Sequence, residues 1–268
     1  MKESLLIEQR KIESAFFNVL NDLREYLYNL TLVGGWVPYI YSTYLWKKKP
    51  IKIITTVDID FGFGDFKGKK YQKTIFEKLS SLDYSEHHIE IGKIYPVVLF
   101  KEGKIPVEFI TYPDIGRNTI ENLIGIQINI NKVDGFDFLL NHRCKIKIST
   151  GGRKAEYEIH CPIPSAFLYH KGATFLDRED ELKQAKDLHY MYFILRYAPD
   201  ADSILKEIKQ YSNKGYFEDI SEKLYKYFGR KSGKGCLLVE KEHGSDEFIE
   251  DLRKDIFERF SKLIDIIR

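Results

Sequence analysis

The chain has 268 residues, enough for one large domain or two modest ones. Hydrophobic residues make up 43% and charged residues 31% of it, which is typical of globular proteins that bury a core. The 42 basic and 40 acidic residues give a net charge of +2, so the overall charge does not require a nucleic-acid partner. No apolar run is long enough to cross a membrane, and the charged N-terminus does not match a secretory signal. We therefore expect a cytoplasmic protein.

Apolar residues recur at helical spacing between positions 4 and 30, which predicts an amphipathic helix packed on the domain that follows. Residues 31–33 predict a first strand, and Gly34 and Gly35 follow it directly. Glycines at this point let the backbone approach a ligand closely. The next helix, expected up to about residue 46, would then begin with free N–H groups.

A second strand is predicted over about 53–61, and it carries Asp58 and Asp60 between apolar residues. Residues two apart in a strand point to the same face, so both carboxylates would share one side, with their Cα atoms about 6.5 Å apart. Carboxylate oxygens in this arrangement suit Mg²⁺ or Mn²⁺, with water and phosphate completing the shell. Taken alone, an Asp-x-Asp alternation is more often the solvent face of a half-buried strand.

The order of strand, Gly-Gly turn, helix and Asp-x-Asp strand resembles the nucleotidyltransferase superfamily, most closely its AbiEii-like toxin branch. That branch carries a Thr-x-Asp-x-Asp strand, which residues 56–60 match. It usually has an Arg two residues before the Thr, where this chain has Ile54, and Lys52 is a candidate substitute. The resemblance implies nucleotide contacts from Gly34, Gly35 and Thr56.

A helix is predicted over 71–82, followed by a hairpin of residues 95–100 and 105–110. Glu108 stands among apolar neighbours in the second strand of this hairpin. The superfamily places a third carboxylate, more often Asp, on the strand beside the Asp-x-Asp strand. The resemblance therefore implies that Glu108 is a metal ligand and a candidate base, while a solvent-facing Glu would show the same pattern.

Two more strands are expected at 144–149 and 154–160, and prolines at 162 and 164 mark a change to a mostly helical sequence. We therefore predict an N-terminal α/β domain over 1–162 and a helical domain over 163–268. The main predicted helices in the second domain are 182–197, 203–211, 217–228 and 247–267, with a loop at 229–235. The three cysteines, Cys144, Cys161 and Cys236, are odd in number and lack metal-ligand spacing, which fits a reducing compartment.

A second group of residues lies in the predicted helical domain. In the AbiEii-like branch the corresponding helices carry Lys-x-x-Ala-x-x-x-Arg and then a Lys-Asp pair. Lys171 and Arg178 match this spacing and are expected on one helix face, although Ala173 is displaced by one position; Lys186 and Asp187 match the pair. The resemblance, which covers about residues 30–195, implies that the three basic residues bind the triphosphate and that Asp187 is an alternative base. Singly, each would be read as an exposed helix residue in a surface ion pair.

Together these patterns predict an α/β (α+β) protein, with a nucleotidyltransferase-fold mixed sheet flanked by helices and a helical C-terminal domain. The resemblance implies transfer of a nucleoside monophosphate from Mg-NTP to a hydroxyl of tRNA, a protein or a small molecule. Asp58, Asp60 and Glu108 would be the metal ligands. By analogy with the branch, the chain would be a toxin with a separately encoded antitoxin, or part of a phage-defence system. The alternative is a non-catalytic nucleotide-binding module that keeps the scaffold.

Overall fold

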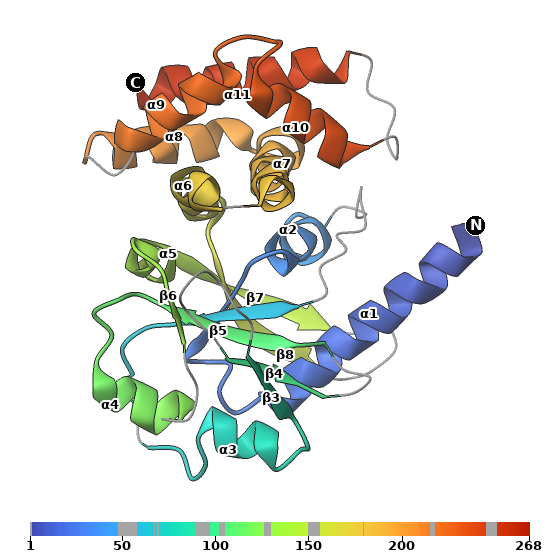
Figure 1. The fold of residues 1–268 in the computed structure, drawn as a ribbon, viewed down its shortest axis with the longest axis vertical. Helices are drawn as coiled ribbons and strands as arrows, with labels where there is room; N and C mark the ends of the chain where they lie inside the picture. The colour runs from blue at the N-terminus through green and yellow to red at the C-terminus, as the bar shows by residue number, and fades with distance from the viewer. Residues whose placement is uncertain are drawn as a thin grey trace. The chain divides into compact units, whose positions relative to one another are not determined.

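The computed structural model describes residues 2–47, 58–66, 68, 70–88, 97–101, 105–125, 130–149, 156–178, 180–214, 218–244 and 251–268 (Figure 1). The chain divides into two compact units, Met1–Tyr39 with Ile53–Pro162, and Ile40–Lys52 with Ile163–Arg268. The first holds the sheet and the second is helical. The predicted fold class is therefore confirmed: a mixed sheet flanked by helices, followed by a helical C-terminal region.

The sheet of the first unit has the strand order β3-β4-β5-β2-β1-β8-β7, and β6 pairs with β5 outside this path. The pairs β1–β8, β2–β5 and β5–β6 are parallel, and the other pairs are antiparallel. The strands are β1 Leu30–Val33, β2 Ile59–Phe63, β3 Ser85–His88, β4 Val97–Phe100, β5 Val107–Thr111, β6 Asn131–Lys132, β7 Arg143–Ser149 and β8 Glu156–Pro162.

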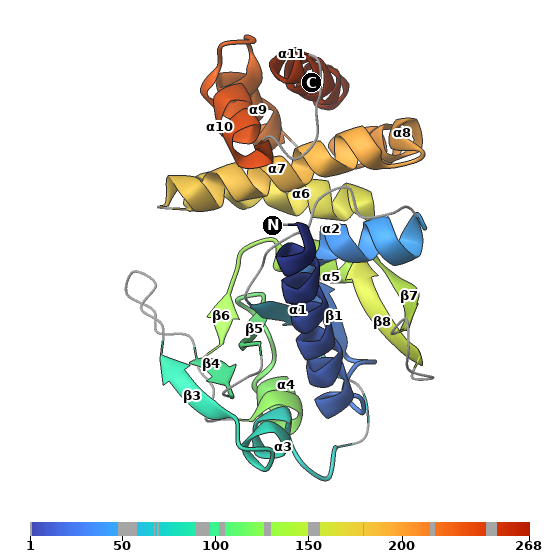
Figure 2. The same cartoon turned by 90° about the vertical axis from the view of Figure 1, so that its right-hand side faces the viewer.

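The two faces of the sheet differ in chemistry because the strands alternate. Ile59 and Phe61 on β2 and Val107 and Phe109 on β5 are buried, while the residues between them are only half-buried. This apolar face is covered by α1 Lys2–Asp22, whose Phe16 and Phe17 are buried (Figure 2). Contact between α1 and this face includes the ring of Phe17, whose centroid lies 6.0 Å from that of Tyr157 on β8.

The opposite face is covered in part by the short helix α5, Phe136–Asn141. A Cβ added to Gly62 of β2 would lie 2.7 Å from the Phe136 ring and 2.9 Å from the Leu140 side chain. Gly62 therefore lets α5 approach the sheet closely, on the face to which residue 60 also points. The remaining helices of this unit are α2 Trp36–Ile40, α3 Ile75–Ser80, α4 Arg117–Thr119 and the π-helix η2 Ile120–Ile124.

Two helices of the first unit are shorter than predicted. The helix expected over 4–30 ends at Asp22, and residues 23–29 form turns in which Tyr26 and Asn29 bond to carbonyls three residues back, leading the chain into β1. The helix expected over 71–82 spans only Ile75–Ser80, because the Thr74 hydroxyl and the Glu77 carboxylate form a capping box at its start.

The second unit is an assembly of helices around α7, whose residues 187–195 are all buried. Its described elements are the π-helix η1 Tyr41–Leu45, α6 Pro164–Thr174, the 3₁₀ turn η3 Phe175–Asp177, α7 Glu181–Tyr197, α8 Ala201–Ser212, α9 Glu218–Phe228, α10 Lys234–His243 and α11 Leu252–Ile267. The four main predicted helices are present. Helix α10 was not among them, and it begins inside the segment expected to be a loop.

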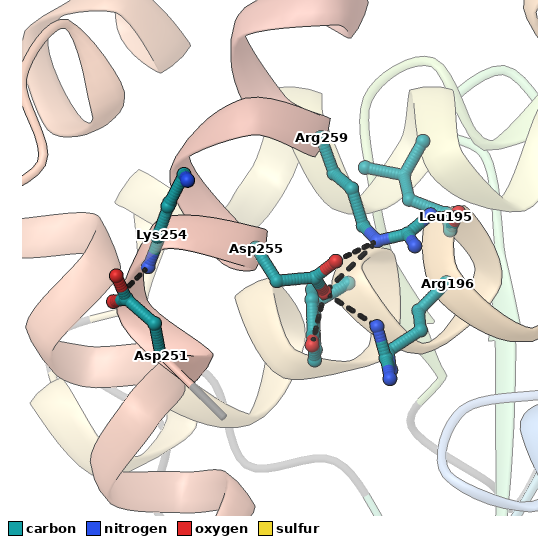
Figure 3. A network of polar contacts seen from close by, with 7 residues as sticks. Leu195, Arg196, Asp251, Lys254, Asp255 and Arg259 are labelled. Atoms are coloured by element: carbon teal, nitrogen blue, oxygen red, sulfur yellow. Dashed lines mark hydrogen bonds and ion pairs between the residues drawn. The ribbon is translucent and has the colours of Figure 1, made fainter. Parts of the chain in front are cut away.

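A polar network joins α11 to α7 (Figure 3). The Asp255 carboxylate accepts hydrogen bonds from the Tyr192 hydroxyl at 2.7 Å and from Arg259 Nε at 3.0 Å, and it lies 2.9 Å from Arg196 Nη1. Arg259 also donates to the Leu195 carbonyl at 2.6 Å. Burial alone would raise the pKa of Asp255, but the bonds from Arg259 and Tyr192 and the nearby positive charges outweigh it and lower the pKa.

We expect Asp255→Asn to reduce the free energy of unfolding by about 2 kcal/mol, because it removes the charge that two arginines share. The lowered pKa makes this contribution present above about pH 4 and lost as the pH falls through the folded-state pKa. Chemical denaturation of both proteins at pH 7 and pH 3 measures the difference, which should shrink at the lower pH. Asp202→Asn, at an exposed ion pair with Lys262, is the control and should leave the midpoint unchanged. Equal effects of the two substitutions would contradict the role of the network.

Candidate active site

Gly34 directly follows β1 and is in contact with the carboxylate of Asp60. Its φ of 68° lies in the left-handed region, which favours glycine. A Cβ added here would lie 1.8 Å from Asp60 Oδ2. The carboxylate thus occupies the space that any side chain at this position would need, and Val33, one residue earlier, is the register partner of Asp60. Backbone conformation and side-chain packing both require glycine here.

Asp58 was predicted to lie on the second strand, but it forms a bend directly before β2, which begins at Ile59. Its carbonyl oxygen accepts a hydrogen bond from the indole of Trp36 at 3.0 Å. Trp36 is the first residue of α2, and its ring stacks on Phe16 with centroids 4.2 Å apart. A buried aromatic side chain therefore ties the backbone of Asp58 to the turn that follows Gly34.

Glu108 of β5 is the register partner of Asp60, so the two carboxylates point to the same face from neighbouring strands about 4.8 Å apart. Both side chains are half-buried. Asn131 on β6 donates a hydrogen bond from Nδ2 to Glu108 Oε1 at 3.4 Å, a long contact that orients the carboxylate. The sheet thus brings Glu108 to the Asp-x-Asp segment from a distant part of the sequence.

These carboxylates fit a hard divalent cation that keeps water and phosphate ligands. Within the described residues, no group of three or more His, Cys, Asp or Glu side chains is arranged to hold a metal by itself. Mg²⁺ is usually held by one or two carboxylates and by the phosphates of its substrate, so a pair on neighbouring strands meets its needs. Two carboxylates on one face also repel each other, and this repulsion favours the binding of a cation between them.

The second group of predicted residues lies in the second unit, where it forms a buried ion pair. Lys171 Nζ lies 2.5 Å from Asp187 Oδ1, and these two side chains are only 6% and 5% exposed. Arg178 donates from Nε to Asp187 Oδ2 at 3.2 Å. Burial alone would raise the pKa of Asp187, but Lys171 and Arg178 outweigh it and hold the pKa below its usual value. The anion beside Lys171 is therefore a carboxylate of the same unit.

The prediction that Lys171 and Arg178 lie on one helix face is wrong. Helix α6 ends at Thr174, a 3₁₀ turn follows, and Arg178 has an extended backbone after it. The two side chains come together because both bind the carboxylate of Asp187, which belongs to α7. Lys186 is half-buried on α7 beside Asp187, and Thr56, like Lys52 and Ile54, lies outside the described residues.

Sequence reasoning missed two residues that position the carboxylates. Trp36 directly follows Gly34 and Gly35 and is one of only two tryptophans, so its place in the sequence was a usable signal. Asn131 gave no such signal, because it approaches Glu108 only through the pairing of β6 with β5.

A cavity of about 640 Å³ lies at the ends of β1 and β2 that are farthest from Gly34 and Asp58. Asn29 precedes β1, Asp65 follows β2 and Tyr112 follows β5, whereas Gly34 and Asp58 lie at the opposite ends of β1 and β2. The cavity is separate from the carboxylate site, and its acidic lining would repel a triphosphate. Its four aspartates are Asp65, Asp114, Asp134 and Asp137.

Comparison with known proteins identifies the family of this chain. A family model described as nucleotidyltransferase matches residues 16–212, a range that includes both groups of predicted residues. Comparison with curated proteins and with solved structures gives no match. None of the helices in the described ranges has both the length and the apolar character needed to cross a bilayer.

We expect Lys171→Met to lower the free energy of unfolding by about 3–5 kcal/mol, because it leaves the buried Asp187 with only one cation. The double variant Lys171→Met/Asp187→Leu should recover much of that loss, since Arg178 is 42% exposed and its side chain can turn to water. Denaturant unfolding of the three proteins tests this. Lys145→Met, at an exposed pair with Glu158, is the control and should not change stability measurably. A double variant as unstable as Lys171→Met would contradict the pairing.

Proposed function

Because the chain belongs to the nucleotidyltransferase family, we propose that it transfers a nucleoside monophosphate from a nucleoside triphosphate to an acceptor hydroxyl. The acceptor oxygen attacks the α-phosphorus, the bond to the β-phosphate breaks, and pyrophosphate leaves. The observation that carries this proposal is the Asp60 carboxylate, which is packed against Gly34 and paired in register with Glu108.

Asp58 and Asp60 are proposed to hold the divalent cation together with the phosphates, and Glu108, the register partner of Asp60, is proposed to share it. When bound, Mg²⁺ or Mn²⁺ lowers the negative charge of the triphosphate and polarises the α-phosphate. Gly34 and Gly35 are proposed to let the phosphates approach the backbone, since a side chain at Gly34 has no room. The resemblance to the superfamily adds Thr56 to this set.

Glu108 is the better candidate for the general base. Both oxygens of Asp187 already accept hydrogen bonds from cations, and its lowered pKa makes it a weak proton acceptor. Glu108 is half-buried and is contacted by the neutral amide of Asn131. We therefore propose that Glu108 takes the proton of the acceptor hydroxyl.

The basic residues of the second unit are proposed to bind phosphate in different ways. Arg178 is 42% exposed and donates from Nε to Asp187, and the rest of its guanidinium is proposed to contact a phosphate oxygen. Lys171 is buried, so its proposed contribution is to hold Asp187, which in turn holds Arg178. Lys186 is proposed as a further phosphate contact from the motif resemblance alone.

The motif order, from Gly34 and Gly35 through residues 56–60 to Lys186 and Asp187, supports the finer proposal of an AbiEii-like toxin. The acceptor would be a hydroxyl of tRNA, a protein or a small molecule, and a separately encoded antitoxin would be the partner. We propose a cytoplasmic setting because the reaction needs a nucleoside triphosphate and a divalent cation.

Two departures from the family pattern favour a second candidate, a nucleotide-binding module without activity. Ile54 stands where the toxin branch has Arg, and Glu108 stands where the superfamily more often has Asp. Incubating the purified chain with labelled nucleoside triphosphates, Mg²⁺, and total RNA or lysate decides between the two. Label transferred to an acceptor supports the enzyme, whereas metal-dependent binding without transfer supports the module.

We expect Asp60→Asn to reduce transfer at least a hundredfold, because the amide keeps the shape of the side chain but is a poor ligand for a hard cation. The melting temperature should not fall, since the change also removes repulsion from Glu108. Asp65→Asn, in the separate cavity, is the matched control and should retain transfer. Near wild-type transfer by Asp60→Asn would show that the metal assignment is wrong.

Gly34→Ala tests the contact between the glycine and Asp60, and Gly244→Ala provides a close control. Gly244 has φ 67° and ψ −156°, a conformation almost confined to glycine, but nothing lies within 4 Å of an added Cβ, so Gly244→Ala introduces backbone strain without a steric contact. Only Gly34→Ala should displace the Asp60 carboxylate, and it should lower transfer at least tenfold beyond any effect of Gly244→Ala. Calorimetric titration with Mg-NTP provides a second readout. Equal activities of the two variants would contradict the proposed role of the contact.

A further inference from the structure

Two of the three cysteines face each other across the β7–β8 hairpin. Cys144 of β7 is the register partner of Cys161 of β8. Seven consecutive pairs fix this register, from Arg143 opposite Pro162 to Ser149 opposite Glu156. A slip of one residue would turn the buried residues of both strands to the wrong face, so the two cysteines are held opposite each other.

This arrangement meets the geometric requirement of a disulfide. Directly opposed residues of an antiparallel pair have Cα atoms about 4.5–5.5 Å apart, within the range of about 4.4–6.8 Å that disulfides span. Opposed residues also point to the same face of the sheet. Ile146 and Ile159, the opposed pair two positions further along, are buried, so both thiols point to the apolar face.

The two thiols differ in access to solvent. Cys144 is partly exposed, whereas Cys161 is 0% exposed. A reagent in solution therefore meets Cys144 first, and only a neighbouring thiol can reach Cys161. This is the usual division between an attacking and a resolving cysteine.

We propose that Cys144 and Cys161 form a reversible cross-strand disulfide by exchange with a small disulfide such as glutathione disulfide. The Cys144 thiolate attacks one sulfur of the small disulfide and releases one glutathione thiolate, which leaves a mixed disulfide on Cys144. Cys161 then loses its proton and displaces the second glutathione. Two protein thiols are oxidised to one disulfide, and one glutathione disulfide is reduced to two thiols that take up the two protons.

The bond would act at the point where the chain leaves the first unit. Cys161 is followed by Pro162, the last residue of that unit, and α6 begins at Pro164. The bridge would fasten the end of β8 to the start of β7 and prevent the hairpin from opening there. Neither cysteine belongs to the proposed transfer machinery, so this inference is independent of the proposed function.

The rate of exchange should depend on pH in a defined direction. Burial raises the pKa of the Cys144 thiol and, more strongly, that of Cys161. Because the thiolate is the nucleophile, the rate should increase about tenfold per pH unit while the pH remains below the Cys144 pKa. The exchange should therefore be slow near neutral pH and faster at pH 9.

The test treats the full chain with glutathione disulfide, quenches with acid, alkylates under denaturing conditions and maps peptides by mass spectrometry. We expect a linked pair of peptides containing Cys144 and Cys161, which dithiothreitol reverses. The oxidised chain should melt about 5 °C or more above the reduced chain. Cys236→Ser should behave as the wild type, since Cys236 lies in the second unit.

The single variants distinguish the two steps. Cys161→Ser should stop at a mixed disulfide with glutathione on Cys144, and Cys144→Ser should leave Cys161 unmodified. The wild-type chain itself carries the main readout, so the test stands even if a variant fails to fold. Two free thiols at Cys144 and Cys161 after oxidation at pH 9, or bridges that involve Cys236 or a second chain, would overturn the proposal.

Discussion

The contact between Gly34 and the carboxylate of Asp60 constrains the centre of the first unit. It needs a left-handed backbone at the end of β1, and it needs the register that sets Val33 opposite Asp60. The same residue of β2 is paired with Glu108 on its other side. Moving β2 or β5 by one residue would place its carboxylate on the apolar face, where burial of charge is costly, and moving β1 would turn Leu30 and Leu32 away from that face. The site and the core therefore depend on the same register.

The two units deal with buried charge in opposite ways. In the first unit, Asp60 and Glu108 share one half-buried face, where two carboxylates close together would favour the proposed cation. In the second unit, Asp187 is almost fully buried and is neutralised by Lys171 and Arg178 of the same unit. The first arrangement would favour binding of a cation, whereas in the second the buried carboxylate is already paired with cations of the same unit.

Much of the fold could be predicted because its signals are local. Strands β1, β2, β4, β5, β7 and β8, the Gly34–Gly35 turn and the main helices of the second unit follow from periodicity and turn residues within short windows, whereas β3 and β6 were not predicted. The helix ends were less predictable, as the stop at Asp22 shows, because turn hydrogen bonds replace helical ones without a breaking residue. Helix α10 was missed since its short buried face, including Cys236 and Val239, lies in a highly charged sequence.

The candidate site was only partly predictable, because several of its contacts join residues that are far apart in the sequence. Asp58 and Asp60 belong to one short segment, but the carbonyl of Asp58 also accepts a hydrogen bond from Trp36, 22 residues earlier in the chain. The pairing of Lys171 with Asp187 and that of Cys144 with Cys161 both link distant positions, and a sequence pattern does not encode such partners. Long-range register decides these contacts, and it becomes visible only when the strands and helices are assembled.

The replacement of the usual aspartate by Glu108 fits the geometry of the sheet. A glutamate is one methylene longer, so its carboxylate extends further from the strand than that of Asp60 beside it. Asn131, whose register partner Ile110 lies two residues after Glu108 on β5, donates to Glu108 Oε1 at 3.4 Å. A longer carboxylate with one oriented oxygen can contact a cation near Asp60 and still reach an acceptor hydroxyl beyond it. The same extension that weakens the match to the family pattern therefore supports the proposed role of Glu108 as the base.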